Sequence, residues 1–232
     1  QQEQIMTAPG YHTDLKTFSL EKLKGLTKKT RLLPSQQILG ENIDERFECL
    51  EQHGIENLEQ LQKAIKTKTK IESFSKATGL SVNYLTILRR EVNSYQPKPI
   101  NLEDFPGMKP DVLQKLEGIS IKNTGQLFPN VLTPKDRSEF AKQNQIDDDD
   151  ILELTKLTDV ARTKWVGPKF ARLLIESEYD TVEKIANANH EELFFALERV
   201  NEKSGIYKGK FGMEDMRFWV VSVQEVPQII QY

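Results

Sequence analysis

Cysteine is nearly absent from this chain, and so are long apolar runs. Cys49 is the single cysteine among 232 residues, so no disulfide can form within the chain. Chains without disulfides are typical of reducing compartments, which favours a cytoplasmic protein. No apolar run approaches the roughly 20 residues that a helix needs to cross a bilayer, and a membrane protein is therefore not expected.

A strong excess of either charge is also missing. Charged residues make up 29% of the chain, but the formal net charge is only -3, so any contact with nucleic acid has to be local. Basic residues gather in Lys16–Arg31 and again in Lys63–Lys70. These clusters are either ordinary solvated surface or places where a polyanion binds.

Arrangements of residues that would indicate catalysis or metal binding are not found. The three histidines, His12, His53 and His190, stand apart without the spacing of metal ligands. The acidic run Asp147–Asp150 lacks the glycine and distant glutamate of a calcium loop, and indicates the first turn of a helix. Cys49 lies in an apolar stripe, where a small buried side chain is expected rather than a nucleophile. The sequence predicts no enzyme, no cofactor and no metal.

Helical periodicity is the pattern that is present. Apolar residues recur every three to four positions in Leu85–Val92, Ile151–Leu157 and Phe194–Val200, and no segment alternates as a strand does. The sequence therefore predicts an all-α protein. Side chains suited to cap a helix precede several of the expected helices, namely Ser81, Thr133 and Asn189.

An internal repeat organises most of the chain. A shift of 66 positions places Phe47 on Leu113 and Leu50 on Leu116, and a shift of 58 positions then places Leu116 on Leu174. Two prolines in the stretch 94–101, SYQPKPIN, predict a linker. The expected organisation is a basic N-terminal arm over residues 1–35, followed by helical repeat units over 36–96, 97–160 and 161–232.

The repeated segments FPGMKPDVLQKLEGI and KWVGPKFARLLIESEY resemble the helix-hairpin-helix motif, in which two helices are joined by a Pro-Gly-hydrophobic-Gly turn. The tandem arrangement is similar to an uncharacterised bacterial family built of such units, distantly like the small DNA-binding domains of DNA polymerases. The resemblance implies an all-α fold of tandem, divergent helix-hairpin-helix-like repeats. It also implies binding to DNA without regard to base sequence, through turn amides and nearby cations that meet phosphates.

Neither of these two segments has the complete motif. FPGMKPDVLQKLEGI, which forms the second hairpin of the chain, keeps Gly107 but has Lys109 at the second glycine position of the motif. KWVGPKFARLLIESEY, which forms the third hairpin, keeps Gly167 but has Trp165 at the first glycine position. The first hairpin, ILGENIDERF, opens with carboxylates that would repel phosphate. Residues expected to contact a nucleic-acid backbone through the resemblance are Gly107, Lys109, Lys164, Gly167, Lys169 and Arg172.

Two functions remain open from the sequence. One is sequence-independent binding of DNA, and the other is a protein-interaction scaffold whose hairpins have lost their ligand. Trp165, at a hairpin turn, either caps the fold or presents its ring to a base. Tyr207, beside Lys208 and Lys210, is the other aromatic residue expected at the surface, where a base could stack. Core packing is expected for most of the remaining aromatic residues in helical stripes, namely Phe194, Phe195, Phe218 and Trp219.

Overall fold

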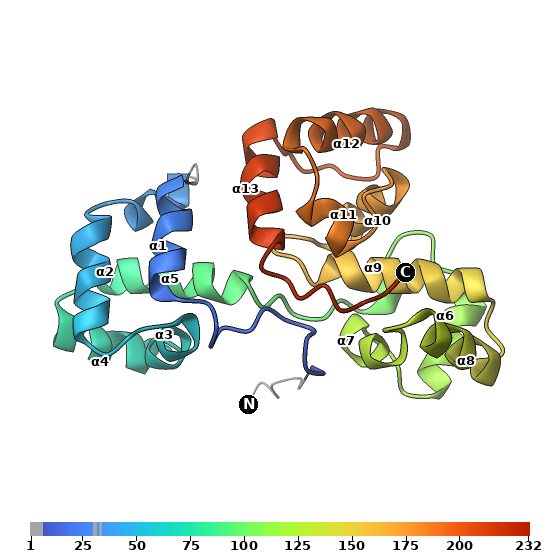
Figure 1. The fold of residues 1–232 in the computed structure, drawn as a ribbon, viewed down its shortest axis with the longest axis horizontal. Helices are drawn as coiled ribbons and strands as arrows, with labels where there is room; N and C mark the ends of the chain where they lie inside the picture. Colours follow the sequence, from blue (N-terminus) through green and yellow to red (C-terminus); the bar gives the residue numbers. More distant parts are fainter. Residues whose placement is uncertain (1–6, 30–31, 33) are drawn as a thin grey trace. The chain divides into compact units, whose positions relative to one another are not determined.

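The computed structural model describes residues 7–29, 32 and 34–232, and these residues are helical without a single strand (Figure 1). They form two compact units. The N-terminal unit is Asp14–Tyr95, and the C-terminal unit is Gln96–Tyr232 with the described residues up to Thr13. The boundary between the units falls within the proline-containing stretch 94–101.

The N-terminal unit is built from five α-helices and one 3₁₀-helix among its described residues. Their bounds are α1 Leu20–Lys29, η1 Pro34–Leu39, α2 Ile43–Gln52, α3 Leu58–Ala64, α4 Lys68–Thr78 and α5 Val82–Ser94. One apolar core joins these helices, and Leu23, Leu50 and Leu85 are fully buried in it.

The C-terminal unit continues the helical pattern. Its helices are η2 Leu102–Asp104, α6 Pro110–Gly118, α7 Thr124–Leu127, η3 Phe128–Asn130, α8 Pro134–Asn144, α9 Asp148–Ala161, α10 Pro168–Glu176, α11 Val182–Ala186, α12 His190–Ser204 and α13 Met213–Val223. Its main core runs from Leu102 to Val226, and Tyr11, Phe128 and Ile230 form a smaller cluster apart from it. The expected boundary at residue 160 therefore does not separate two cores.

The basic arm expected over residues 1–35 is mostly folded where the structure describes it. Residues 1–6, 30–31 and 33 lie outside the described residues. Leu15, Phe18 and Leu20 are buried in the core of the N-terminal unit. These apolar side chains, spaced between the lysines, make α1 and the segment before it part of the unit rather than an extension of it.

Helices α2–α5 recur as α6–α9 at the spacing of 66 residues. Helix α8 begins and ends 66 residues after α4, and η3 ends where the last residue of α3 is expected. The capping residues keep the same spacing. Asn57, Thr67 and Ser81 accept a backbone N–H of their own helix, and so do their counterparts Asn123, Thr133 and Asp147. The cap expected at Asn189 is also confirmed.

Three turns in the chain share one backbone geometry. Gly54, Ser120 and Glu178 all have positive φ, at +80°, +64° and +65°. The next residue in each turn donates its N–H across five residues, Ile55 to Leu50 O, Ile121 to Leu116 O and Tyr179 to Leu174 O, at 2.9–3.1 Å. This bond satisfies a carbonyl at the end of α2, α6 or α10, as in a Schellman motif. The spacings are again 66 and 58 residues.

Candidate nucleic-acid interface

The second hairpin turn leads into α6 through Gly107, Met108 and Lys109. Gly107 has a φ of +82°, a conformation that glycine adopts without the steric cost of a side chain. Lys109 precedes α6, and its Nζ lies 2.7 Å from Asp150 Oδ1 at the start of α9. The hydrogen bond to Asp150 raises the pKa of the Lys109 ammonium. The cation expected to meet phosphate is thus already paired with a carboxylate.

Arg172 lies behind the same turn, although it belongs to α10. Its side chain is largely buried, and a Cβ added at Gly107 would lie 3.8 Å from the Arg172 Nη2. The same nitrogen donates to Glu153 Oε1 at 2.8 Å. The buried side chain of Arg172 in α10 therefore contacts both the second turn and α9. The structure brings Gly107, Lys109 and Arg172 together, but each cation faces a carboxylate.

The third hairpin turn connects α9 to α10 and has a different surface. Trp165 occupies the position of Gly107 and has a φ of +69°, unusual for a residue with a bulky side chain. Trp165 is 50% exposed, and the Nζ of Lys164 lies 4.4 Å from its ring centroid. The turn therefore presents an aromatic ring at the surface, whereas Lys164, expected to contact phosphate, is only 6% exposed.

Gly167 and Lys169 lie at the start of α10, which we call open because neither other side chains nor acceptors cover it. No atom outside the immediate chain neighbours lies within 4 Å of the position that a Cβ would take at Gly167. Lys169 is exposed, and its side chain makes no hydrogen bond or ion pair among the residues that the structure describes. The Ala171 N–H bonds to Gly167 O at 2.9 Å, whereas the amides of Lys169 and Phe170 find no acceptor in the described chain. Unsatisfied amides at a helix start attract anions.

The acidic run 147–150 starts α9, as the sequence predicts, because Asp147 caps the helix. Asp150 pairs with Lys109, which places negative charge at the second turn. One carboxylate likewise pairs with two lysines of α1, since Asp44 lies 2.9 Å from Lys24 and 2.7 Å from Lys28.

The remaining aromatic predictions have mixed outcomes. Tyr207, expected at the surface, packs its ring 5.1 Å from Phe170, and its N–H donates to Asn201. Trp219 is buried in the core, but Phe195 is 52% exposed on α12. Core packing is therefore confirmed for Trp219 and wrong for Phe195.

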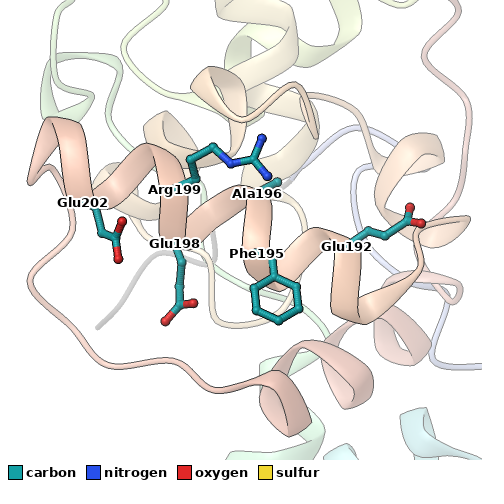
Figure 2. A pocket seen from close by; sticks show the side chains of 6 residues that line it. All are labelled: Glu192, Phe195, Ala196, Glu198, Arg199 and Glu202. Atoms are coloured by element: carbon teal, nitrogen blue, oxygen red, sulfur yellow. The ribbon is translucent and has the colours of Figure 1, made fainter.

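A shallow depression follows the exposed side of α12 (Figure 2). The residues that line it all come from this one helix: Glu192, Phe195, Ala196, Glu198, Arg199 and Glu202. A hollow lined by a single helix face does not enclose a ligand. Among the residues that the structure describes, no group of His, Cys, Asp and Glu is arranged to hold a metal ion.

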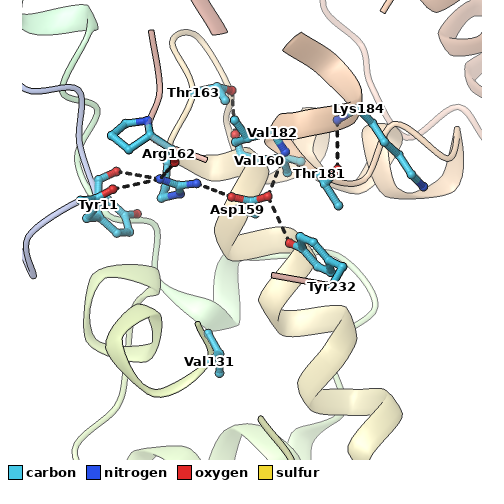
Figure 3. Close-up of polar contacts among 12 residues, drawn as sticks. Tyr11, Val131, Asp159, Val160, Arg162, Thr163, Thr181, Val182, Lys184 and Tyr232 are labelled. Carbon is cyan, nitrogen blue, oxygen red and sulfur yellow. Dashed lines mark hydrogen bonds and ion pairs between the residues drawn. The ribbon is translucent and has the colours of Figure 1, made fainter. Parts of the chain in front are cut away.

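A buried ion pair at the end of α9 was not found by sequence reasoning. Asp159 and Arg162 are only 2% and 1% exposed and pair with each other (Figure 3). Asp159 Oδ2 accepts the Val182 N–H at 2.9 Å and the Tyr232 hydroxyl at 3.1 Å. Arg162 Nη1 donates to the carbonyls of Gly10 and Pro227, both at 3.1 Å. The pair thus joins α9 to α11 and to two extended segments of the C-terminal unit.

His12 lies beside this pair and predicts a dependence of stability on pH. Burial and, to a smaller extent, the Arg162 guanidinium lower the pKa of His12 from 6.5 to about 4. Because the pKa of His12 is lower in the folded than in the unfolded protein, the neutral ring contributes to the free energy of unfolding. This contribution is complete above about pH 6.5 and is lost as the pH falls toward 4.

We therefore expect acidification from pH 7 to pH 4.5 to destabilise the wild type by about 1–2 kcal/mol more than His12→Phe. The variant keeps a ring edge-on to Tyr11, whose centroid lies 4.8 Å away, but cannot titrate. Urea unfolding at both pH values measures the difference. Equal acid sensitivity of the two proteins would show that His12 is not buried as described.

Residues 106–226 match the family described as "Domain of unknown function (DUF4332)". This match covers more than half of the 232 residues. The chain belongs to this family. The DUF4332 region begins at the second turn, contains the third turn and the Asp159–Arg162 pair, and ends just after α13. It leaves out α1–α5, although α2–α5 repeat the arrangement of α6–α9.

Two further comparisons, with curated proteins and with solved structures, found no similar protein. None of the helices in the described part of the chain is long and apolar enough to cross a membrane.

Proposed function

We propose that the protein binds the sugar-phosphate backbone of nucleic acid through the third hairpin turn, residues 164–170. The observation that carries the proposal is the open start of α10. There the free amides of Lys169 and Phe170, the exposed Lys169 ammonium and the uncovered Gly167 lie at the positive end of one helix dipole.

The resemblance to tandem helix-hairpin-helix repeats supports this proposal. The second and third turns each have a residue of positive φ, an extended residue that caps the helix, and proline as the first helical residue. A turn of this kind lets a phosphate approach the backbone closely. The second turn has the same backbone, but Asp150 and Glu153 neutralise its cations, so the third turn carries the binding.

Changing one lysine in each turn tests the proposal. Lys169→Gln and Lys109→Gln each remove one positive charge close to a glycine turn, and both side chains are exposed. We expect Lys169→Gln to weaken binding of a fluorescein-labelled 20-base-pair DNA several-fold and to lower the slope of log K against log salt by about 1. Lys109→Gln should stay within about twofold of wild type because Asp150 already compensates its charge.

Fluorescence anisotropy at 50–200 mM salt gives both numbers. The proposal is wrong if neither duplex nor single-stranded DNA binds at low salt, or if the two variants weaken binding equally.

A protein-interaction scaffold is the second candidate function. Two observations favour it. Lys109 and Arg172 are each paired with a carboxylate of the chain, and Trp165 is half-exposed. Protein interfaces use aromatic anchors more than free cations. A stoichiometric protein partner that survives nuclease and high salt, and is lost in Trp165→Ala, would favour this function over the first.

A further inference from the structure

The C-terminal unit uses one surface of its repeat to dock extended segments of the chain. This surface lies at η3 and the start of α8. The ring of Tyr11 packs 5.2 Å from that of Phe128, and the Gln231 N–H donates to Leu132 O at 2.8 Å. Arg137 completes it by donating to Gln231 O at 2.6 Å. The docked segments cover this part of the C-terminal unit.

The same surface in the N-terminal unit has a different composition. Moving back 66 positions, Phe128 becomes Gln62, Leu132 becomes Lys66 and Asp136 becomes Lys70. Lys63 and every residue from Lys66 to Lys70 are exposed. Helices α3, α4 and α5 begin 66 residues before their counterparts and have the same caps, so the fold itself does not require lysines here.

The charge difference between the two copies is large. Residues 59–91 contain five lysines, two arginines and three glutamates, a net charge of +4. Residues 125–157, which form the same helices 66 positions later, contain four basic and seven acidic side chains, a net charge of -3. Since the whole chain has a net charge of -3, the positive charge is concentrated on one copy of the repeat.

Contacts of the described side chains hold several of these cations around the connection between α3 and α4. Lys70 Nζ donates to Lys63 O at 2.9 Å, and Arg89 Nη1 donates to Lys66 O at 3.4 Å. The exposed side chains of Lys66 and Arg90 make no ion pair in the described part of the chain. We call the surface around this connection, with Lys63, Lys66, Lys68, Lys70, Arg89 and Arg90, the basic patch.

We propose that the basic patch of the N-terminal unit binds a nucleic-acid backbone, independently of the third hairpin turn. Lys63 pairs with Glu59 at 2.9 Å and Lys68 with Glu72 at 3.9 Å, but Lys66, Lys70, Arg89 and Arg90 have no carboxylate partner among the described residues. Clustered cations of this kind release the counterions of a polyphosphate, and the hydroxyls of Thr67 and Thr69 on the same exposed stretch suit phosphate oxygens. In the C-terminal unit, segments of the chain itself cover the docking surface. In the N-terminal unit, the corresponding surface at the α3–α4 connection binds the nucleic acid instead.

The surface fits a membrane or an acidic protein less well. Val82, at the opposite end of α5 from Arg90, is the one large apolar side chain that is exposed among the described residues of the N-terminal unit. A membrane-bound helix needs an apolar face, and a protein interface needs aromatic or aliphatic anchors at its centre. A phosphate backbone needs neither.

Matched charge reversals on the two copies test this inference in the full chain. Lys66→Glu/Arg90→Glu changes the basic patch, and Lys135→Glu/Lys142→Glu makes the same change of charge on α8 of the other copy. We expect the patch variant to bind a labelled 20-base-pair DNA at least about tenfold more weakly at 50 mM salt, with a salt slope smaller by about 2. The α8 variant should stay within about twofold, and circular dichroism should show both folded.

The fluorescence of Trp165 separates this site from the third turn. DNA at the third turn should quench the exposed Trp165, and Lys169→Glu should abolish that quenching while the patch still binds labelled DNA. Loss of all binding in Lys169→Glu with no effect of the patch variant would overturn the inference and leave the proposed function standing. The reverse pattern would support the patch and reject the third turn.

Other outcomes of the binding assay would also overturn the proposal that the basic patch binds nucleic acid. Equal weakening by the patch and α8 variants would overturn the inference, and so would the absence of DNA binding at 50 mM salt. Tighter binding to phosphatidylserine vesicles or to poly-glutamate than to DNA would replace the nucleic acid with a membrane or an acidic protein.

Discussion

Replacing Arg162 with leucine is expected to lower the free energy of unfolding of the C-terminal unit by about 3–5 kcal/mol. The substitution leaves Asp159 buried without its cation and removes the donor to the carbonyls of Gly10 and Pro227. A buried charge that loses its partner keeps its full desolvation cost. Urea unfolding followed by circular dichroism measures the change.

Arg217→Leu is the matched control for this substitution. Arg217 also pairs with a carboxylate three residues away, Glu214, but both side chains are exposed. An exposed pair contributes no more than about 1 kcal/mol. If Arg162→Leu costs no more than Arg217→Leu, the Asp159–Arg162 pair does not hold the unit together as described.

Replacing Leu174 with alanine is expected to destabilise the C-terminal unit by about 2–5 kcal/mol and to leave the N-terminal unit unchanged. Leu174 is fully buried in the core of the C-terminal unit, and Leu50 occupies the same place before the shared turn in the N-terminal unit. Because the two cores are separate, the loss should stay within one unit.

Native-state hydrogen exchange resolves the two units in one experiment. Leu174→Ala should speed exchange of amides in residues 96–232, and Leu50→Ala should speed exchange in residues 14–95. Faster exchange throughout the chain in either variant would mean that the units fold as one, against the description of two cores.

Much of the helical framework could be predicted from local rules. Asn57, Thr67 and Ser81 are side chains that suit helix starts, and a shift of 66 positions finds their counterparts without knowledge of the fold. The common turn geometry is hidden, because Ser120 and Glu178 carry no sign of their positive φ. Only Gly54 has the residue type that this conformation favours.

The candidate site was predicted less well, because the predicted cations depend on distant partners. Lys109 meets Asp150 across 41 residues, and Arg172 meets Glu153 across 19, which no motif records. Asp159 and Arg162, three residues apart, look like an ordinary surface pair in the sequence. Their burial depends on the extended segments around Gly10 and Pro227, whose packing a periodicity argument does not reach.

The most direct test of the central claim is the chemical shift of the backbone amides at the start of α10. In a titration of ¹⁵N-labelled protein with a 20-base-pair DNA at low salt, the amides of Gly167, Lys169 and Phe170 should shift in a saturable manner. The amides of Gly107 and Lys109 at the carboxylate-paired second turn should stay in place. Saturable DNA binding that leaves the amides of residues 164–170 unmoved would contradict the claim that the third turn is a phosphate-binding site.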